Sequence, residues 1–275
     1  MTLSASQVAE LMSRHGLKPS RALGQNFVID PNTVRRIARL AEVGSGQKVV
    51  EIGAGLGSLT LALIETGAEV LAVELDRYLI PVLEEVVEPH GARVVQGDAL
   101  VLDWQELLVD PPWVLVANLP YNVATIVVAD LLDHVPAISR MLVMVQREVG
   151  ERMAAKVGDK AYGALSVKIA YWAKASLVGR VPPTVFLPQP RVESTLVSIE
   201  RLVAPAVDPS QVDSKWLFTL VRAGFAQRRK MLRRSLAGLV APEAFIDAGI
   251  RPEARAEELD VIEWGRLAQN AKQPA

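Results

Sequence analysis

Cysteine is absent from the 275 residues, and histidine occurs only three times. Without thiols the chain forms no disulfide, has no thiolate nucleophile and builds no cysteine-type zinc site. The three histidines, His15, His90 and His134, are scattered along the chain, so a histidine-based metal site is not expected either. We predict that the protein uses no metal, and the lack of cysteine agrees with a location in the cytoplasm.

Long apolar runs are also missing, although half of the residues are hydrophobic. A membrane-spanning helix needs about 20 consecutive apolar residues. The richest stretch, residues 114–135, is interrupted by Asn118, Pro120, Asn122, Asp130, Asp133 and His134. The N-terminus lacks the pattern of a signal peptide, in which basic residues precede an apolar run. We expect a soluble intracellular protein that makes no contact with membranes.

The chain has no overall excess of positive charge, because 30 basic residues face 31 acidic ones. The basic residues are unevenly distributed, however. Residues 14–39 hold six of them against the single Asp30, and residues 221–234 hold six with no acidic residue, namely Arg222, Arg228, Arg229, Lys230, Arg233 and Arg234. A helix from residue 215 onward would place Arg222, Arg229 and Arg233 on one face. Such a face can simply be solvated, but the absence of acids favours contact with RNA phosphates.

Apolar segments of strand length alternate with helical patterns from residue 47 to residue 156. The predicted strands are 48–52, 70–73, 93–95, the run ending at 117, and 141–145, and the predicted helices are 58–66, 78–87, 123–133 and 147–156. This alternation is typical of a doubly wound parallel sheet. Two further strands, 177–181 and 195–199, are close enough along the chain to pair antiparallel. Helices at 4–15 and 32–40 precede the sheet, and residues after about 206 are predicted to be helical.

Polar groups follow three successive predicted strands at their carboxyl ends, where open α/β sheets bind ligands. The first strand leads into Gly53-Ala54-Gly55-Leu56-Gly57, the second ends at Glu74, and the third is followed by Asp98. Glycines allow a close approach of backbone to ligand, Glu74 can accept both hydroxyls of a ribose, and Asp98 can accept an adenine amino group. The G-x-G-x-G spacing differs from the G-x-G-x-x-G of pyrophosphate-binding loops. This set favours S-adenosylmethionine over NAD, and so disfavours an NAD-dependent oxidoreductase.

The fourth strand is followed by Asn118-Leu119-Pro120-Tyr121. The Asn118 side chain and the Leu119 main chain each offer a carbonyl acceptor, and Tyr121 offers a flat ring. Two neutral acceptors beside a ring suit a planar base that carries an amino group. The alternative is an ordinary strand-to-helix turn, with Asn118 as the helix cap and Pro120 in the first turn. The residues of this turn alone leave both interpretations open.

These motifs resemble those of the KsgA-type small-subunit ribosomal RNA adenine dimethyltransferases. The resemblance extends from Gly24 to about Ser235, through the segments 24–27, 51–55, 73–76, 97–98, 118–122, 144–153, 162–166, 186–194 and 225–230. The related large-subunit erythromycin-resistance methylases share the cofactor motifs, but segments 146–152 and 162–166 favour the small-subunit branch. Two residues depart from the family pattern: Val28 replaces a leucine, and Arg234 stands where asparagine is usual.

The resemblance implies a binding site for S-adenosylmethionine at Asn26, Val28 (main chain), Gly53, Glu74, Asp98 and Asn118. It also implies that Tyr121 and Phe186 stack on a target adenine turned out of the RNA, whose amine Asn118 and Leu119 hold. From its local sequence Phe186 could equally be a core residue, but the prolines on both sides favour an exposed position. The predicted RNA contacts are Arg222, Arg228, Arg229, Lys230 and Arg233.

Together these observations predict an α/β protein: a Rossmann-like class I methyltransferase sheet dependent on S-adenosylmethionine, with a small C-terminal helical domain. Residues 1–206 would form the catalytic domain with its N-terminal arm, and residues 207–275 an RNA-binding domain. The expected activity is N6-dimethylation of adjacent adenines in small-subunit ribosomal RNA, on the immature small subunit, by a monomer. The alternatives are a small-subunit assembly factor in which methylation is secondary, and a large-subunit adenine methyltransferase.

Overall fold

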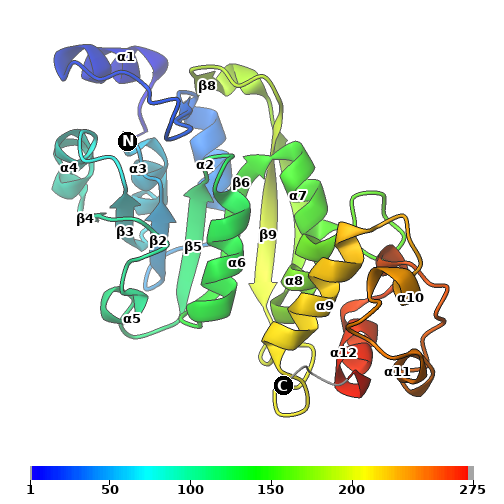
Figure 1. The fold of residues 1–275 in the computed structure, drawn as a ribbon. Helices are drawn as coiled ribbons and strands as arrows, with labels where there is room; N and C mark the ends of the chain where they lie inside the picture. Colours follow the sequence, from blue (N-terminus) through cyan, green and yellow to red (C-terminus); the bar gives the residue numbers. More distant parts are fainter. Residues whose placement is uncertain (1, 272–275) are drawn as a thin grey trace. The chain divides into compact units, whose positions relative to one another are not determined.

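The computed structural model of the protein describes residues 2–271. The chain forms two compact units (Figure 1). The first comprises Met1–Gly150 and Ser176–Glu200, and the second comprises Glu151–Ala175 and Arg201–Ala275. The change of unit at residue 201 lies close to the boundary predicted at residue 206. The second unit also includes residues 151–175, which the sequence pattern assigned to the first domain.

In the described residues seven strands form the central sheet, in the order β4-β3-β2-β5-β6-β9-β7 (Figure 1). Their bounds are β2 Lys48–Ile52, β3 Glu69–Glu74, β4 Arg93–Gln96, β5 Trp113–Asn118, β6 Ile138–Gln146, β7 Ala173–Val181 and β9 Ser194–Arg201. Strands β2 to β6 run parallel, and β9 pairs antiparallel with β6. The connections reverse direction between β2 and β5, which creates the crevice where such sheets bind ligands.

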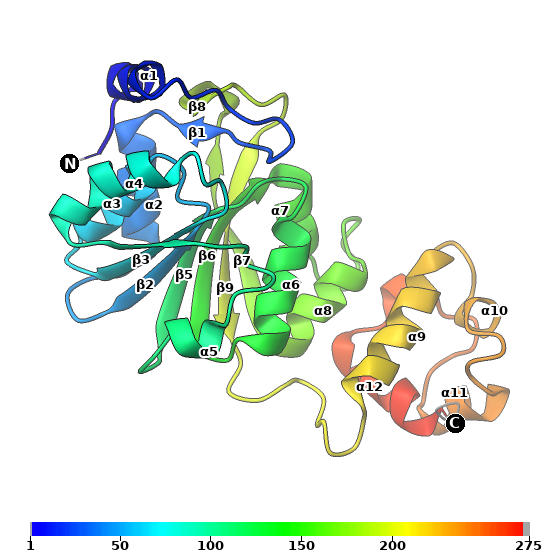
Figure 2. The same ribbon diagram turned by 60° about the vertical axis from the view of Figure 1, so that its left-hand side comes forward.

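Helices cover both faces of this sheet, as the strand sequences require. Side chains of consecutive strand residues point to opposite faces, yet Val49 and Val50 of β2 are both 0% exposed. Helices α2 (Pro31–Leu40), α3 (Ser58–Ile64) and α4 (Ile80–Val87) lie on one face, and α6 (Ala124–His134) lies on the other (Figure 2). A short helix, α5 (Trp104–Leu107), which the sequence pattern did not predict, precedes β5.

The N-terminal arm starts with α1 (Ala5–Arg14), where Ser4 and Gln7 form a capping box. It then contributes β1 (Phe27–Val28), which pairs antiparallel with β8 (Phe186–Leu187) and lies apart from the central sheet. The alternation of apolar and polar residues did not reveal these strands, because two residues are too few to show a period. Phe27 and Val28 are buried in the main core. The arm is therefore packed into the first unit.

The second unit is helical and has a core of its own. Its helices are α8 (Ala164–Trp172), α9 (Ser214–Ala226), α10 (Leu232–Ser235), α11 (Pro242–Asp247) and α12 (Val261–Asn270), and α7 (Arg147–Ala154) spans the change of unit. Tyr171 of α8 meets the Phe218 ring of α9 edge-on, with 5.3 Å between ring centroids. This aromatic contact joins residues 151–175 to the C-terminal helices, which explains why the two segments belong to one unit.

The single helix predicted from residue 215 through the basic segment is wrong. Helix α9 ends at Ala226, the next residues form a turn in which the Lys230 amide bonds to the Gln227 carbonyl, and α10 begins only at Leu232. Arg222 therefore lies on α9, Arg229 in the turn and Arg233 on α10. These three residues therefore do not share the one helical face that the sequence had predicted.

None of the helices within residues 2–271 combines the length and the apolar character that a membrane crossing requires.

Close packing of α7 against β9 predicts that Gly150→Ala is destabilising. A Cβ atom at Gly150 would clash with the Thr195 side chain and lie 3.0 Å from Val197. Alanine favours a helix by about 1 kcal/mol over glycine, but overpacking costs about 1–3 kcal/mol, and the severe overlap with Thr195 favours the upper end, for a net loss of about 2 kcal/mol. Urea unfolding measures the change. Gly44→Ala is the control, because its Cβ would make only an ordinary contact of 3.7 Å; equal stability of the two variants would contradict the prediction.

Candidate active site

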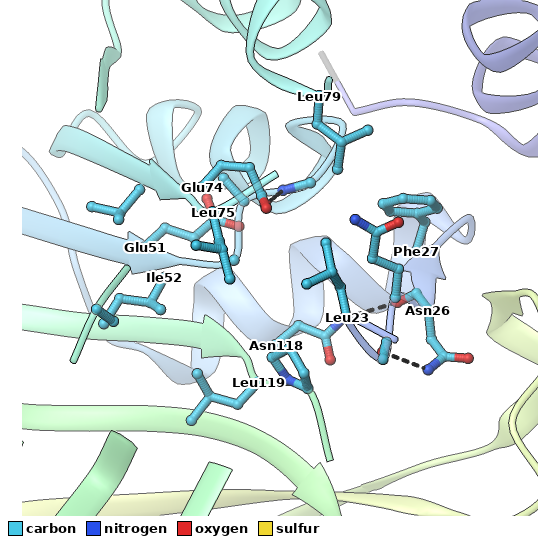
Figure 3. A pocket seen from close by; sticks show the side chains of 18 of the residues that line it. Leu23, Asn26, Phe27, Glu51, Ile52, Glu74, Leu75, Leu79, Asn118 and Leu119 are labelled. Carbon is cyan, nitrogen blue, oxygen red and sulfur yellow. Dashed lines mark hydrogen bonds between the residues drawn. The ribbon is translucent and has the colours of Figure 1, made fainter. Parts of the chain in front are cut away.

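A pocket opens at the carboxyl ends of β2, β3, β4 and β5, and the N-terminal arm forms one of its walls (Figure 3). Most of the predicted site residues line it. They are the predicted cofactor residues Asn26, Val28, Gly53, Glu74, Asp98 and Asn118, together with Leu119 and Tyr121. Segments that are far apart in the sequence thus meet at the edge of the sheet that the strand pattern indicated.

The glycine loop between β2 and α3 brings the arm against the sheet. Gly55 has φ +60°, and a Cβ atom there would lie 3.1 Å from the Phe27 ring. Any side chain at this position would be strained and would push Phe27 away. The loop is glycine-rich in part because the arm packs directly on its backbone.

Glu74 is held by the backbone of the same loop. Its Oε2 accepts the Gly55 amide at 2.8 Å (Figure 3). Its Oε1 accepts the Asp76 amide at 2.9 Å. Burial raises the pKa of Glu74, and these amides oppose the rise. Each carboxylate oxygen keeps acceptor capacity beyond one amide. Glu74 is therefore a fixed acceptor at the pocket wall, suited to vicinal hydroxyls.

Two leucines that the sequence reasoning missed line the pocket near the acidic residues. Leu75 directly follows Glu74, and Leu100 lies two residues after Asp98, whose Oδ1 accepts the Leu100 amide at 2.9 Å. They are 49% and 38% exposed, so much of each side chain is accessible to a ligand. Apolar side chains beside two carboxylates can cover the faces of a flat ring. The sequence did contain a signal for these two residues, because each leucine lies within two residues of an acidic residue that was predicted to bind the cofactor.

Asn118 has a fixed amide orientation. Its Nδ2 donates to the main-chain carbonyl of Asn26 at 3.1 Å, which leaves Oδ1 as a free acceptor (Figure 3). Asn118 does not cap the next helix, because the N-cap of α6 is Val123 and the Pro120 carbonyl accepts the first amides. The interpretation of this turn as an ordinary helix cap is therefore wrong.

The main chain of Leu119 supplies the second acceptor. Its amide bonds to the Met144 carbonyl of β6 at 3.1 Å, which anchors the turn to the sheet. Within the described part of the chain no donor bonds to the Leu119 carbonyl. The pocket wall thus carries two neutral oxygen acceptors on neighbouring residues, Asn118 and Leu119.

The two predicted stacking residues have different environments. Tyr121 lines the pocket, and its hydroxyl hydrogen-bonds to Ser194 Oγ at 2.7 Å. Phe186 lies opposite Val28 in the β1–β8 pair, is 3% exposed and belongs to the main core. The prediction that the flanking prolines expose Phe186 is wrong, because strand pairing turns its ring inward. The structure does not bring Phe186 into the pocket.

Glu51 is a buried carboxyl group beside the glycine loop, and its chemistry was not anticipated. It is 1% exposed, and its Oε2 accepts a hydrogen bond from the Thr60 hydroxyl at 2.6 Å. Burial raises the pKa of Glu51 to about 8, with a further contribution from the nearby Glu74 carboxylate. The group is therefore mostly uncharged at pH 7.

The basic residues of the second unit are only partly available to a partner. Arg228 forms an ion pair with Glu257 at 2.6 Å and donates to the Lys160 carbonyl, and Arg233 lies 3.4 Å from Glu253. In contrast, Arg222, Arg229 and Lys230 are exposed, and none of them has an ion-pair partner in the described chain. Two of the five predicted RNA contacts therefore already have internal partners.

Residues 2–271 contain no group of three or more histidine, cysteine, aspartate or glutamate side chains that could hold a metal ion. The polar groups that line the pocket include two neutral acceptors, a tyrosine and carboxylates that are held by backbone amides.

The chain is similar to known proteins over most of its length. A family model described as ribosomal RNA adenine dimethylase matches residues 16–273. The ribosomal RNA small subunit methyltransferase A of Kineococcus radiotolerans is 47% identical over 97% of this chain and 90% of its own length. The protein of the same name from Thermobifida fusca is 46% identical, over 98% of this chain and 96% of its own.

Solved structures share the fold. A dimethyladenosine transferase from Plasmodium falciparum has a TM-score of 0.71 at 24% identity, covering 86% of this chain and 94% of its own. The 23S ribosomal RNA methyltransferase ErmE has a TM-score of 0.69 at 24% identity, covering 90% of this chain and its full length. These likenesses confirm the predicted class of sheet.

The raised pKa of Glu51 makes a prediction about pH and stability. Glutamate in the unfolded chain ionises near its ordinary pKa of 4.5, whereas burial raises the pKa of the folded Glu51 to about 8. The contribution of Glu51 to stability should therefore fall as the pH rises from 4.5 to 8, by up to about 1.4 kcal/mol per pH unit, and level off above 8. Glu51→Gln removes this loss, so its stability relative to the wild type should grow over the same range.

Urea unfolding at several pH values measures this difference. Glu69→Gln, on the exposed first residue of β3, controls for the loss of a carboxyl group. A stability difference between Glu51→Gln and wild type that does not change between pH 5 and pH 8 would contradict the prediction.

Proposed function

Because the chain belongs to the family of ribosomal RNA adenine dimethylases, we propose that it adds two methyl groups to N6 of adenines in small-subunit ribosomal RNA. The observation that carries this proposal is the oriented Asn118 amide beside the Leu119 carbonyl, in the pocket at the carboxyl edge of the sheet. Both oxygens accept hydrogen bonds and neither is charged, which matches the demands of an exocyclic amine.

S-adenosylmethionine is the methyl donor. The pocket residues fit it: Glu74 would hold the ribose hydroxyls, Asp98 the adenine amino group, and Leu75 and Leu100 the faces of its ring. Gly53 has φ +76°, a backbone conformation that residues with a side chain rarely adopt, and glycine allows the loop backbone to come close to the ligand. When bound, the donor supplies an electrophilic methyl group on a positively charged sulfur.

The two acceptors act on the target amine. The lone pair of an adenine amine is delocalised into the ring, so the amine is a poor nucleophile. Hydrogen bonds from its N–H groups to Asn118 Oδ1 and to the Leu119 carbonyl favour a pyramidal nitrogen whose lone pair is available. Positive charge would grow on this nitrogen as its bond to the methyl carbon forms and the bond from that carbon to the donor sulfur breaks, which leaves a neutral thioether. Both hydrogen bonds would strengthen in this transition state. The nitrogen then releases a proton to water.

The same arrangement can serve a second transfer. After one methylation the nitrogen keeps one N–H, which either acceptor can hold. Positioning and neutral acceptors are sufficient for both methyl transfers, because no residue has to gain or lose a proton between the first transfer and the second. Dimethylation is supported further by the description of the family.

The target base must leave its stack to reach the pocket. Tyr121 can offset the lost stacking with its own ring, a contact worth about 1–3 kcal/mol per base. Its hydroxyl is tied to Ser194 of β9, which holds the ring in one orientation. Burial raises the pKa of Tyr121, so its hydroxyl stays neutral in this role.

The small ribosomal subunit is the favoured source of the RNA. Relatives that are 46–47% identical over nearly the full chain carry the small-subunit name, whereas the likeness to the 23S enzyme ErmE is 24%. Arg222, Arg229 and Lys230, three exposed basic residues of the second unit that have no ion-pair partner in the described chain, would contact the phosphates. Such a substrate would place the activity in the cytoplasm. A role in subunit assembly could accompany methylation.

Asn118→Ala tests the proposed chemistry. Removing one transition-state acceptor should lower turnover by about 100-fold, as for the loss of a comparable hydrogen-bonding group in other enzymes. Tritium incorporation from labelled S-adenosylmethionine into immature small subunits measures turnover, and filter binding measures RNA affinity, which should stay unchanged. Ile126→Ala, at an exposed residue of α6, is the control. Unchanged turnover in Asn118→Ala would remove Asn118 from the mechanism.

Arg229→Glu tests the role of the second unit. Reversing an exposed charge should weaken RNA binding several-fold and reduce its dependence on salt, while the affinity for S-adenosylmethionine measured by calorimetry stays the same. Lys174→Glu reverses the charge of another exposed residue of the same unit and serves as the control. The proposal for Arg229 fails if both variants bind RNA equally well.

A further inference from the structure

A second cleft adjoins the cofactor pocket and has no part in the mechanism described above. The two share Gly24, Gln25 and Asn26, and the second cleft is completed by Arg21 on one side and by Pro188, Gln189 and Arg191 on the other. Its lining comes from two segments that are more than 160 residues apart in the sequence. Two arginines therefore flank a depression that continues into the active site.

The pairing of β1 with β8 explains why the two arginines lie together. The strands are antiparallel, with Phe27 opposite Leu187 and Val28 opposite Phe186. In an antiparallel pair, the residues that precede one strand and those that follow the other leave at the same end. Arg21 lies before β1 and Arg191 lies after β8, so both arginines lie at the same end of the two-stranded sheet, where they line the cleft.

Hydrogen bonds of Gln25 fix the segment that carries Arg21. The Gln25 Oε1 accepts the Ser20 amide at 2.7 Å, and its Nε2 donates to Asp76 Oδ2 at 2.8 Å. Gly24, with φ +64°, packs so closely on the Asn118–Tyr121 turn that a Cβ atom would lie 3.3 Å from Pro120 Cβ. The floor of the cleft is therefore in contact with the turn that would hold the amine.

The charge of the cleft is uncompensated. Arg21 and Arg191 are exposed, and neither has an ion-pair partner within the described residues. Glu193, the acidic residue nearest to Arg191 along the chain, is paired with Arg147 at 3.2 Å. Asp76 already accepts the Gln25 amide. Two free guanidinium groups facing a common depression are suited to phosphate oxygens, which they bind in a bidentate manner.

We propose that this cleft binds the phosphodiester backbone of the nucleotides that flank the target adenosine, with Arg21 and Arg191 on its two sides. This inference rests on the proposed function, since it needs a single-stranded RNA whose base enters the adjoining pocket. A base that is turned out of its stack stays attached to its own phosphates, and these must be held near the pocket mouth. The cleft is beside the Asn118–Tyr121 turn, where such phosphates would lie.

The double variant Arg21→Ala/Arg191→Ala tests the proposal. Binding of a fluorescein-labelled single-stranded RNA decamer that contains adenines is measured at several salt concentrations. The variant should bind at least about 10-fold more weakly. The negative slope of log K against log [salt] should become shallower by about 1.4, which is about 0.7 for each lost phosphate contact. Arg21→Lys/Arg191→Lys keeps both charges and should restore most of the slope.

Arg93→Ala is the matched control, because Arg93 is an exposed arginine at the amino end of β4, away from the carboxyl edge of the sheet. Calorimetric titration with S-adenosylmethionine should give the same affinity in every variant, which shows that the pocket is folded. If the double alanine variant binds RNA with the affinity and salt slope of Arg93→Ala while the wild type methylates small subunits, the cleft is not a phosphate site and the proposed function stands. If the wild type transfers no methyl group to RNA, the proposed function itself fails.

Discussion

The Nδ2 atom of Asn118 donates a hydrogen bond of 3.1 Å to the main-chain carbonyl of Asn26, and this bond joins the end of β5 to the N-terminal arm. It fixes the amide so that Oδ1 is free to accept. The arm is fixed in turn by the packing of Phe27 on Gly55, by the Gln25–Asp76 hydrogen bond and by the β1–β8 pair. The geometry that would activate an amine thus depends on a segment outside the central sheet.

The acceptors at the amine end of the pocket are neutral, whereas the carboxylates lie at the nucleoside end. Glu74 and Asp98 accept backbone amides and would hold polar groups of the donor. Asn118 and Leu119 instead lie where positive charge would grow on the amine. Their carbonyl oxygens are neutral and do not change protonation between the first and the second methyl transfer. Glu51, kept mostly neutral by burial, adds little negative charge beneath the glycine loop.

The sequence predicted the sheet well because each parallel strand is a short apolar run with a polar residue or glycine at its end; β2 has the predicted bounds, Lys48–Ile52. The strand ends in turn predicted that Gly53, Glu74, Asp98 and Asn118 would lie together, and all four line the pocket. The two-residue strands β1 and β8 carry no period, so the burial of Phe186 could not be foreseen. Counting charges also could not show that Arg228 and Arg233 pair with Glu257 and Glu253, because those acids lie more than 15 residues further along the chain.

The central claim is that the pocket presents an adenine N6 atom to the methyl donor. The most direct measurement incubates the purified protein with S-adenosylmethionine and undermethylated small ribosomal subunits, digests the RNA and identifies the nucleosides by mass spectrometry. The account predicts N6,N6-dimethyladenosine, with N6-methyladenosine as its precursor at early times. Methylation of another base, or of adenine at a ring nitrogen, would contradict it.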